Sequence, residues 1–260
     1  MRMLEYVGRE TSSFFEYVGG AATLLGDSSR FIFTLRIRIK ETLDQAYRLG
    51  VESTAIVCLT SLFTGFVISL ESATQAVQYG AESLIGGGVA FISVRELGPM
   101  LSAVVVAGRT GAAIAAEIGS MVVTEQVEAL QALGLSPVRM LVVPRLVALM
   151  LMMPLLTVFA DLVSFLGGMW IANTSAHVPT DTFLTSAKTA VSFEDVMKGL
   201  FKALVFAIII AVIGAYQGLG TRGGAAGVGK STTGAVVTAI ILIFIANFAM
   251  SYILFRPAGG

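Results

Sequence analysis

The sequence has little charge and few of the side chains that usually build catalytic or metal sites. Only 13% of its 260 residues are charged and the net charge is zero, whereas soluble domains have about 25% charged residues. A single cysteine excludes an internal disulfide and a cysteine-rich metal site, and a single histidine, His177, excludes a multi-histidine site. Zero net charge gives no field that would attract nucleic acid. We also expect no removable signal peptide, because the start lacks a short apolar core with a cleavage site.

Apolar residues make up 55% of the sequence, so the low charge indicates a membrane protein. A membrane-spanning helix needs about 20 mostly apolar residues. Five regions meet that need, at about 53–70, 84–121, 141–171, 200–216 and 235–254. The sequence therefore predicts an all-α membrane protein with five spans.

The first 50 residues differ from the rest of the chain. Apolar residues recur at helical spacing from Met3 to Leu25, with charged residues between them, which is typical of an amphipathic helix on a membrane surface. A soluble helix packed on a partner would show the same period. Basic residues precede the first span and are expected to stay in the cytoplasm: Arg30, Arg36, Arg38, Lys40 and Arg48. This orientation places the 122–140 and 217–233 connections inside.

The second apolar region contains a charged interruption, "SVRELGPML". Arg95 and Glu96 stand in an otherwise apolar run, and charges at membrane depth are costly and usually functional. Pro99 has no N–H to donate to the Arg95 carbonyl, and Gly98 weakens the helix further. We therefore expect a helix broken at Gly98–Pro99 that contacts a substrate headgroup. The alternative is a structural Arg95–Glu96 pair that only fixes helix packing.

Small residues follow at every fourth position. They predict a smooth helix face that lets another helix or protomer approach closely, and the ones we assign to packing are Gly108, Gly111, Ala115 and Gly119. Arg109 and Glu117 are eight residues apart, so both are expected to reach polar partners near the inner surface. Asp161 in the third span is expected to pair across the bundle, and Ser192 with Asp195 predicts the start of the fourth helix.

A short amphipathic helix is predicted in the connection after the second span. Thr124 is expected to cap its start, Gly134 to end it with a left-handed residue, and Pro137 to prevent its continuation. The segment loosely resembles the E-A-A-x-x-x-G loop with which ABC importer permeases contact their ATPase. The residues assigned to ATPase coupling are Glu125, Glu128, Leu130 and Gly134. The alternative is an ordinary connector.

"GGAAGVGKST", residues 223–232, fills every fixed position of the phosphate-binding pattern G-x-x-x-x-G-K-[ST]. A working phosphate loop joins a strand to a helix in an α/β domain, whereas this stretch joins two predicted membrane spans. Nor does the sequence offer a Walker-B strand or an α/β domain. We therefore interpret the match as a tight cytoplasmic turn. A membrane NTPase, which is another function that this pattern could indicate, is rejected.

Four motifs together identify a family. R-E-L-G-P, A-G-R-x-G, A-E-I-G and T-E-Q, at their spacing here, closely resemble the signature of MlaE-type permeases, and the resemblance runs from about Leu49 to Ser251. These are the membrane subunits of ABC systems that move phospholipids between the two membranes of diderm bacteria. The resemblance divides the chain into an N-terminal interfacial segment, 1–50, and an MlaE-type membrane domain, 51–260. Some members of the family have an acidic residue where this sequence has Asn247.

The resemblance implies a homodimer in the inner membrane, with a lipid in a cavity between the protomers and no cofactor. It also implies a separate cytoplasmic ABC ATPase, a periplasmic lipid-binding MCE-domain protein and, in some systems, a STAS-domain protein. The residues it assigns to lipid binding are Arg95, Glu96, Leu97, Tyr79 and Leu70. The function expected is phospholipid transport between inner and outer membranes, which maintains outer-membrane lipid asymmetry. The alternative is an ABC permease for another hydrophobic or small polar solute.

Overall fold

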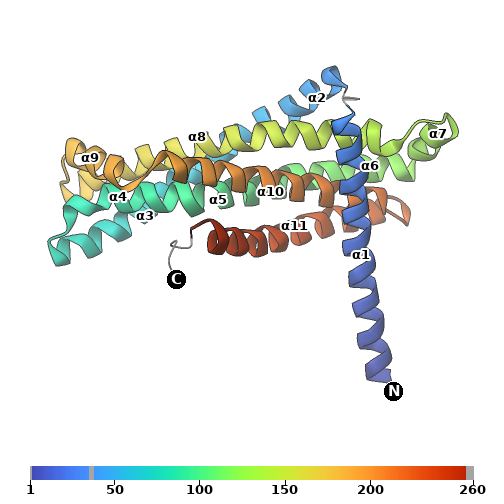
Figure 1. Cartoon of the computed structure of the whole chain (residues 1–260), viewed down its shortest axis with the longest axis horizontal. Helices are drawn as coiled ribbons and strands as arrows, with labels where there is room; N and C mark the ends of the chain where they lie inside the picture. The colour runs from blue at the N-terminus through green and yellow to red at the C-terminus, as the bar shows by residue number, and fades with distance from the viewer. Residues whose placement is uncertain (1, 35–37, 256–260) are drawn as a thin grey trace.

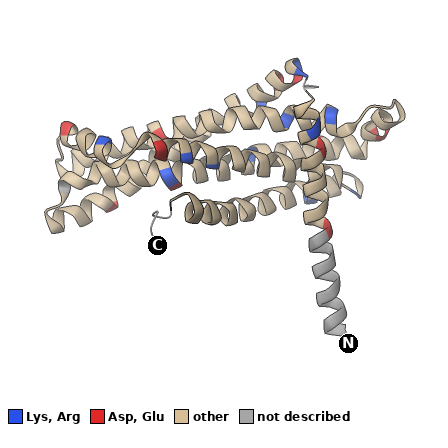
Figure 2. Ribbon diagram, in the orientation of Figure 1, with Lys and Arg blue, Asp and Glu red and all other residues tan. Residues whose placement is uncertain are grey.

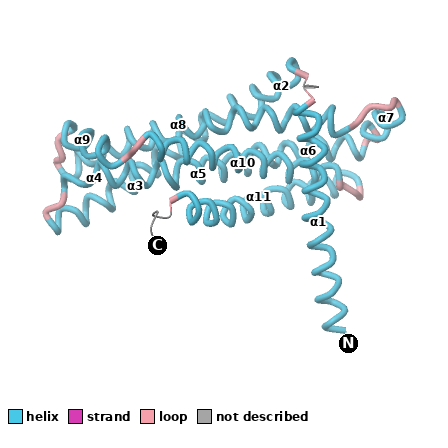
Figure 3. The backbone as a smooth tube through the Cα atoms, viewed as in Figure 1, coloured by secondary structure: helices cyan, strands magenta, loops and turns pink. Residues whose placement is uncertain are grey.

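The computed structural model describes residues 2–34 and 38–255, and in these ranges every regular element is a helix (Figures 1 and 3). Five helical runs in the described residues are long and apolar enough to cross a membrane. Their bounds are Ile39–Tyr79, Ile85–Val123, Val138–Ala176, Phe193–Leu219 and Gly224–Leu254. The predicted all-α class and the five spans are therefore confirmed.

The spans are built from the following helices. The first contains α2 (Ile39–Gln45) and α3 (Thr54–Tyr79); the second contains α4 (Ile85–Ile92), α5 (Gly98–Val106) and α6 (Ala112–Val123); the third contains α8 (Val143–Ala176). The fourth and fifth are α10 (Phe193–Leu219) and α11 (Gly224–Leu254). Two short helices lie in connections at opposite ends of the bundle, α7 (Gln126–Ala132) and α9 (Thr180–Ala190) (Figure 1).

The N-terminal helix α1 (Arg2–Phe33) runs across the bundle at the end that also contains α7 (Figure 1). Its ring of Tyr17 meets the ring of Tyr216 edge to face, at 4.9 Å between centroids, and the Tyr17 hydroxyl accepts a hydrogen bond from Gln217 Nε2 at 3.0 Å. Burial raises the pKa of Tyr17 above its ordinary value, so the hydroxyl stays neutral. Arg36 of the predicted basic cluster lies outside the described residues.

The first spanning run begins earlier than its apolar segment. The apolar run begins near residue 53, but the helical run starts at Ile39, about four turns earlier. Ser192 caps α10 as predicted: its Oγ accepts from the Asp195 N–H at 3.2 Å, and Asp195 Oδ2 accepts from the Ser192 N–H at 3.0 Å.

The spans pack closely where small residues meet. A Cβ on Gly65 of α3 would collide with the Ser164 carbonyl of α8, and one on Gly214 of α10 would lie 3.1 Å from the Gly111 carbonyl. Association in a membrane relies on such close backbone approach, since lipid tails are as apolar as the helices. Glycine at these points brings the first span against the third and the fourth span against the second.

The interruption in the second span takes a different form from the one expected. Residues Ser93–Leu97 form a π-helical turn, and α5 begins directly at Gly98 with Pro99 in its first turn. Pro is tolerated there because the first N–H groups of a helix have no partner inside it. The run therefore continues through Gly98–Pro99 with a changed hydrogen-bond pattern. π-Helical turns are frequent at functional sites.

Candidate functional site

A lysine that is 0% exposed, Lys202 of α10, forms the centre of a polar network between three spans. Its Nζ donates to Glu96 Oε1 at 2.9 Å, to Ser251 Oγ at 2.7 Å and to Asn247 Oδ1 at 3.3 Å. It also donates to the Arg95 carbonyl at 2.8 Å, which is the carbonyl that Pro99 leaves without its usual helical donor. A charge at this depth costs several kcal/mol when unpaired. The opposite charge and three neutral acceptors offset that cost.

The Glu96 carboxylate is held by all three members of the network on α10 and α11. Asn247 Nδ2 donates to Oε2 at 2.9 Å, and Ser251 Oγ donates to both carboxylate oxygens at 2.8 and 3.0 Å. The network thus joins the second, fourth and fifth spans through one carboxylate. Figure 2 shows charged residues near the C-terminal end of α11, within an otherwise mostly uncharged bundle.

Arg95 lies in a second arrangement beside the first. Its Nε and Nη2 contact Asp195 Oδ1 at 2.8 and 2.6 Å, while the other oxygen of Asp195 caps α10. The guanidinium also lies over the rings of Phe91 and Phe255, at 4.0 and 4.4 Å from their centroids. Such cation–π contacts are strongest where water is scarce. Because Asp195 is held in place by the cap of α10, its other oxygen fixes the position of the Arg95 guanidinium.

Exposure differs between the two members of each ion pair. The Arg95 and Glu96 side chains are 25% and 37% exposed, whereas those of Asp195 and Lys202 are 7% and 0% exposed. The second span thus presents one cation and one anion at its surface, each backed by a buried counter-charge on α10. Arg95 and Glu96 do not pair with each other, as the alternative reading supposed; each pairs with a residue of α10 instead.

Of the other residues expected to bind lipid, Leu97 directly follows this pair and is partly buried. Leu70 and Tyr79 are exposed on α3, Tyr79 at 83%. In the described part of the chain, no hydrogen bond or ion pair joins Tyr79 to Arg95 or Glu96. Within the described residues of one protomer, therefore, Tyr79 has no direct polar contact with Arg95 or Glu96.

Sequence reasoning missed Lys202 and Ser251. Lys202 lies inside the apolar run assigned to the fourth span, and the rule that singled out Arg95, a charge at membrane depth, would also have found it. The prediction for Asp161 is wrong. Its Oδ1 is buried with no hydrogen-bond partner among the described residues. This oxygen lies against Gly98, in the space that a Cβ on Gly98 would need.

The connecting helix α7 ends as predicted and begins differently. Gly134 has φ 73°, its N–H donates to the Gln131 carbonyl at 2.9 Å, and the Leu135 N–H donates to the Leu130 carbonyl at 2.9 Å, which is a Schellman ending. The Thr124 cap is wrong: its hydroxyl donates back to Ser120 O at 2.9 Å, and Glu125, with φ 59°, precedes the helix.

The faces of α7 differ in what they contact. Leu130 packs against the core of the bundle, whereas Glu125, Glu128 and Gly134 are exposed. Leu133 is 75% exposed. Val127 of the same helix is buried in this core at 8% exposure. The helix thus combines two apolar anchors with an acidic and apolar outer face.

The small residues assigned to packing fall into two groups. Gly111 and Ala115 are buried against α10, and Gly119 is buried against Thr221 just after it. Gly108 is exposed, and a Cβ there would have no neighbour within 4 Å in this chain.

Arg109 and Glu117, the two charges expected near the inner surface, find polar partners, as predicted. Arg109 Nη2 donates to Glu52 Oε2 at 2.8 Å, and Glu117 Oε2 accepts from Arg145 Nη2 at 2.7 Å. Neither pair contacts the network around Lys202. They tie the second span to the first and third.

Comparison with known proteins decides the family. The sequence profile described as "Permease MlaE" matches residues 42–253. The chain belongs to the MlaE permease family. Similar proteins include a probable ABC transporter permease protein of Synechocystis sp., 44% identical over 95% of this chain and 94% of its own length. Another is a probable ABC transporter permease protein of Rickettsia typhi, 37% identical over 98% and 99%.

A plant protein is also similar. The Arabidopsis thaliana protein TRIGALACTOSYLDIACYLGLYCEROL 1, chloroplastic, is 37% identical over 86% of this chain and 64% of its own length. Family and spans together make the chain an ABC transporter permease and a multi-pass membrane protein. In this MlaE permease, the R-E-L-G-P motif contains the two partly exposed charges described above.

Proposed function

We propose that the permease moves phospholipids between the inner and outer membranes and so maintains outer-membrane lipid asymmetry. The observation that carries this proposal is that Arg95 and Glu96, a cation and an anion, are both partly exposed within an apolar bundle. A phospholipid has a phosphate and, in many cases, a cationic group, next to long apolar chains. A guanidinium suits the phosphate, and a carboxylate suits the cationic group. The Arabidopsis relative, named after a glycerolipid, agrees with a lipid substrate.

Apolar surface for the acyl chains lies on the second span itself and on the first. Leu97 follows the charged pair, and Leu70 and Tyr79 stand exposed on α3. We propose that these three residues contact the lipid tails and the outer boundary of the headgroup. The substrate is accordingly an amphiphile, which distinguishes it from a water-soluble solute.

The permease is proposed to act as a homodimer. The face of α11 that the chain leaves uncovered is apolar, with Phe244 50%, Ile245 59% and Phe248 75% exposed. Asn247 and Ser251 of the same helix belong to the Lys202 network. A second copy opposite this face would enclose a cavity that contains both the charges and apolar walls, and Gly108 offers a further uncovered position.

Transport is proposed to be driven by a separate cytoplasmic ABC ATPase that docks on α7. Glu125, Glu128 and Gly134 lie on its exposed side, and Leu130 fixes the helix to the bundle. A force on α7 would therefore reach the core through Val127 and Leu130. Family membership supports the remaining proposed components, which are a periplasmic MCE-domain protein, in some systems a STAS-domain protein, and a place in the inner membrane.

The alternative is a permease for another hydrophobic or a small polar solute. The two are separated by the ATPase activity of the purified permease–ATPase complex in detergent, measured with added phospholipid and with water-soluble solutes. We expect phospholipid to stimulate ATP hydrolysis by the wild-type complex but not by the Arg95→Gln complex. Stimulation by a polar solute but not by phospholipid would overturn the proposal.

A further inference from the structure

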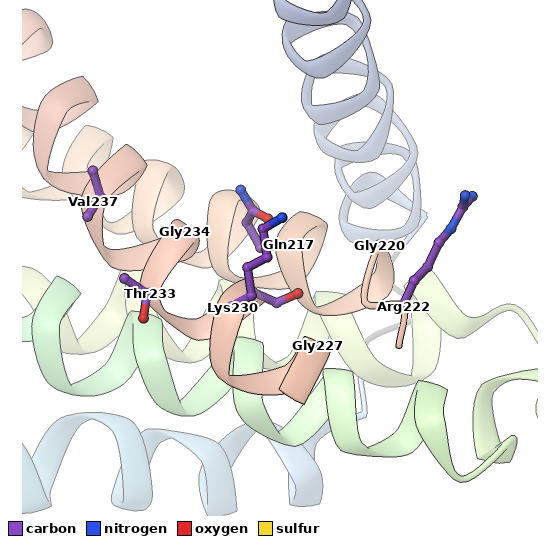
Figure 4. Close-up of a pocket in the computed structure, with 9 residues that line it drawn as sticks. Gln217, Gly220, Arg222, Gly227, Lys230, Thr233, Gly234 and Val237 are labelled. Carbon is purple, nitrogen blue, oxygen red and sulfur yellow. The ribbon is translucent and has the colours of Figure 1, made fainter. Parts of the chain in front are cut away.

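The phosphate-loop-like stretch lines a large cavity at the end of the α10–α11 hairpin. The cavity has a volume of about 750 Å³, and its walls include Gln217, Arg222, Lys230, Ser231, Thr233 and Val237 (Figure 4). In Figure 4 the side chains of Gln217, Arg222 and Lys230 extend to the same side of the hairpin. The cavity is distinct from the Arg95–Glu96 site, because 15 residues of α10 separate Lys202 from Gln217, or about 22 Å of helix.

The cavity is lined by two cations that no nearby carboxylate neutralises in the described part of the chain. Neither Arg222 nor Lys230 forms an ion pair within the described residues, and no Asp or Glu lines the cavity. By contrast, Arg109 and Arg145 each have a carboxylate partner. An anion is therefore the complementary ligand.

The length of α11 places these groups in the bilayer. Its 31 residues extend about 46 Å, while the hydrocarbon core is about 30 Å thick. If the excess is shared equally, about five residues at each end lie at headgroup level. Lys230, the seventh residue of α11, then lies where the headgroups meet the hydrocarbon, and Val237 lies one to two turns inside it.

We infer that this cavity binds the phosphate of a phospholipid from the cytoplasmic leaflet. This inference rests on the proposed function and gives it a second lipid site, on the side of the membrane opposite to the Arg95–Glu96 group. Arg222 and Lys230 contact the phosphate, and the Thr233 hydroxyl lies beside them. Val237 and the exposed Ile241, one turn further, contact an acyl chain. The lysine of the G-x-x-x-x-G-K-S pattern thus meets a phosphate that belongs to a lipid.

The test uses the full-length permease in phosphatidylcholine nanodiscs with a photoactivatable phosphatidylglycerol whose reactive group is on the acyl chain. Cross-links are mapped to peptides of α11 by mass spectrometry. In Arg222→Gln/Lys230→Gln we expect labelling of α11 near Val237 to fall roughly tenfold. Lys40→Gln/Arg48→Gln is the matched control, since it removes two cations from the same side of the membrane, and it should keep wild-type labelling.

Two further probes separate the outcomes. A photoactivatable diacylglycerol with the same chains lacks the phosphate and should label α11 weakly; labelling as strong as with phosphatidylglycerol would overturn the inference. So would unchanged labelling in Arg222→Gln/Lys230→Gln, or cross-links from this segment to a second copy in place of lipid. Arg95→Gln should leave this labelling unchanged. A failure of the proposed function at Arg95 is therefore distinguishable from a failure here.

Discussion

Replacing Lys202 with methionine tests the polar network most sharply. The change keeps the length and apolar stem of the side chain but removes the ammonium that contacts Glu96, Asn247, Ser251 and the Arg95 carbonyl. Removal of one partner from a fully buried ion pair costs about 3–5 kcal/mol. Because the Glu96 side chain is 37% exposed, water recovers part of this, and we expect a loss of about 2–3 kcal/mol.

The loss should appear in thermal unfolding of the purified permease in detergent, followed by intrinsic fluorescence. For a chain of this size 1 kcal/mol corresponds to roughly 2–4 °C, so the midpoint should fall by about 5–10 °C. The double variant Glu96→Gln/Lys202→Met removes both charges, and it should recover most of the loss because no unpaired charge remains. Glu96→Gln alone supplies the fourth corner of the cycle.

The reasoning would be refuted by additive effects. If Lys202→Met lowers the midpoint and Glu96→Gln does not restore it, the two side chains do not depend on each other, and the lysine serves another purpose. A single variant with the wild-type midpoint would refute the buried pair as well.

Three further changes test other parts of the molecule. Gly65→Ala should cost about 1–3 kcal/mol of stability, because the new methyl group meets a carbonyl of α8. Its control, Gly88→Ala, has open space around it and should be neutral or stabilising by up to about 1 kcal/mol. Equal unfolding midpoints for the two variants would contradict the close packing at Gly65. Asp195→Asn removes the anion opposite the site's guanidinium and should cost about 1–3 kcal/mol, with reduced phospholipid-stimulated ATPase activity; an unchanged midpoint and activity would refute its double role as cap and counter-ion. Glu125→Lys with Glu128→Lys should reduce co-purification of the ATPase subunit while the unfolding midpoint stays unchanged, and full co-purification would place the docking site elsewhere.

The sequence predicted the parts of the fold that depend on neighbouring residues. Apolar run length predicted five spans, Ser192 with Asp195 predicted a helix start, and Gly134 predicted a left-handed helix end, since each depends on local chemistry. The start of α7 was wrong because Thr124 prefers the carbonyl one turn back, which is the competing bond open to any helical threonine.

The site itself depended on tertiary structure. Arg95 and Glu96 were recognisable as charges in an apolar run, but their partners lie 100 to 155 residues away in the sequence. A sequence pattern does not say which faces of α10 and α11 meet the second span, so Lys202, Asn247 and Ser251 could not be assigned to Glu96. Asp161 was given a partner by the general rule for buried charges, whereas it lies against the bare backbone of Gly98.

Movement of phospholipid itself is the most direct test of the account. In cells whose own copy of the permease has been replaced by wild type or Arg95→Gln, with Lys188→Gln as a surface control, labelled phospholipid would be followed from one membrane to the other. We expect Lys188→Gln to match the wild type and Arg95→Gln to slow the exchange severely at equal protein level. Exchange at the wild-type rate in Arg95→Gln would contradict the claim that the charges of the R-E-L-G-P motif bind the headgroup of the transported lipid.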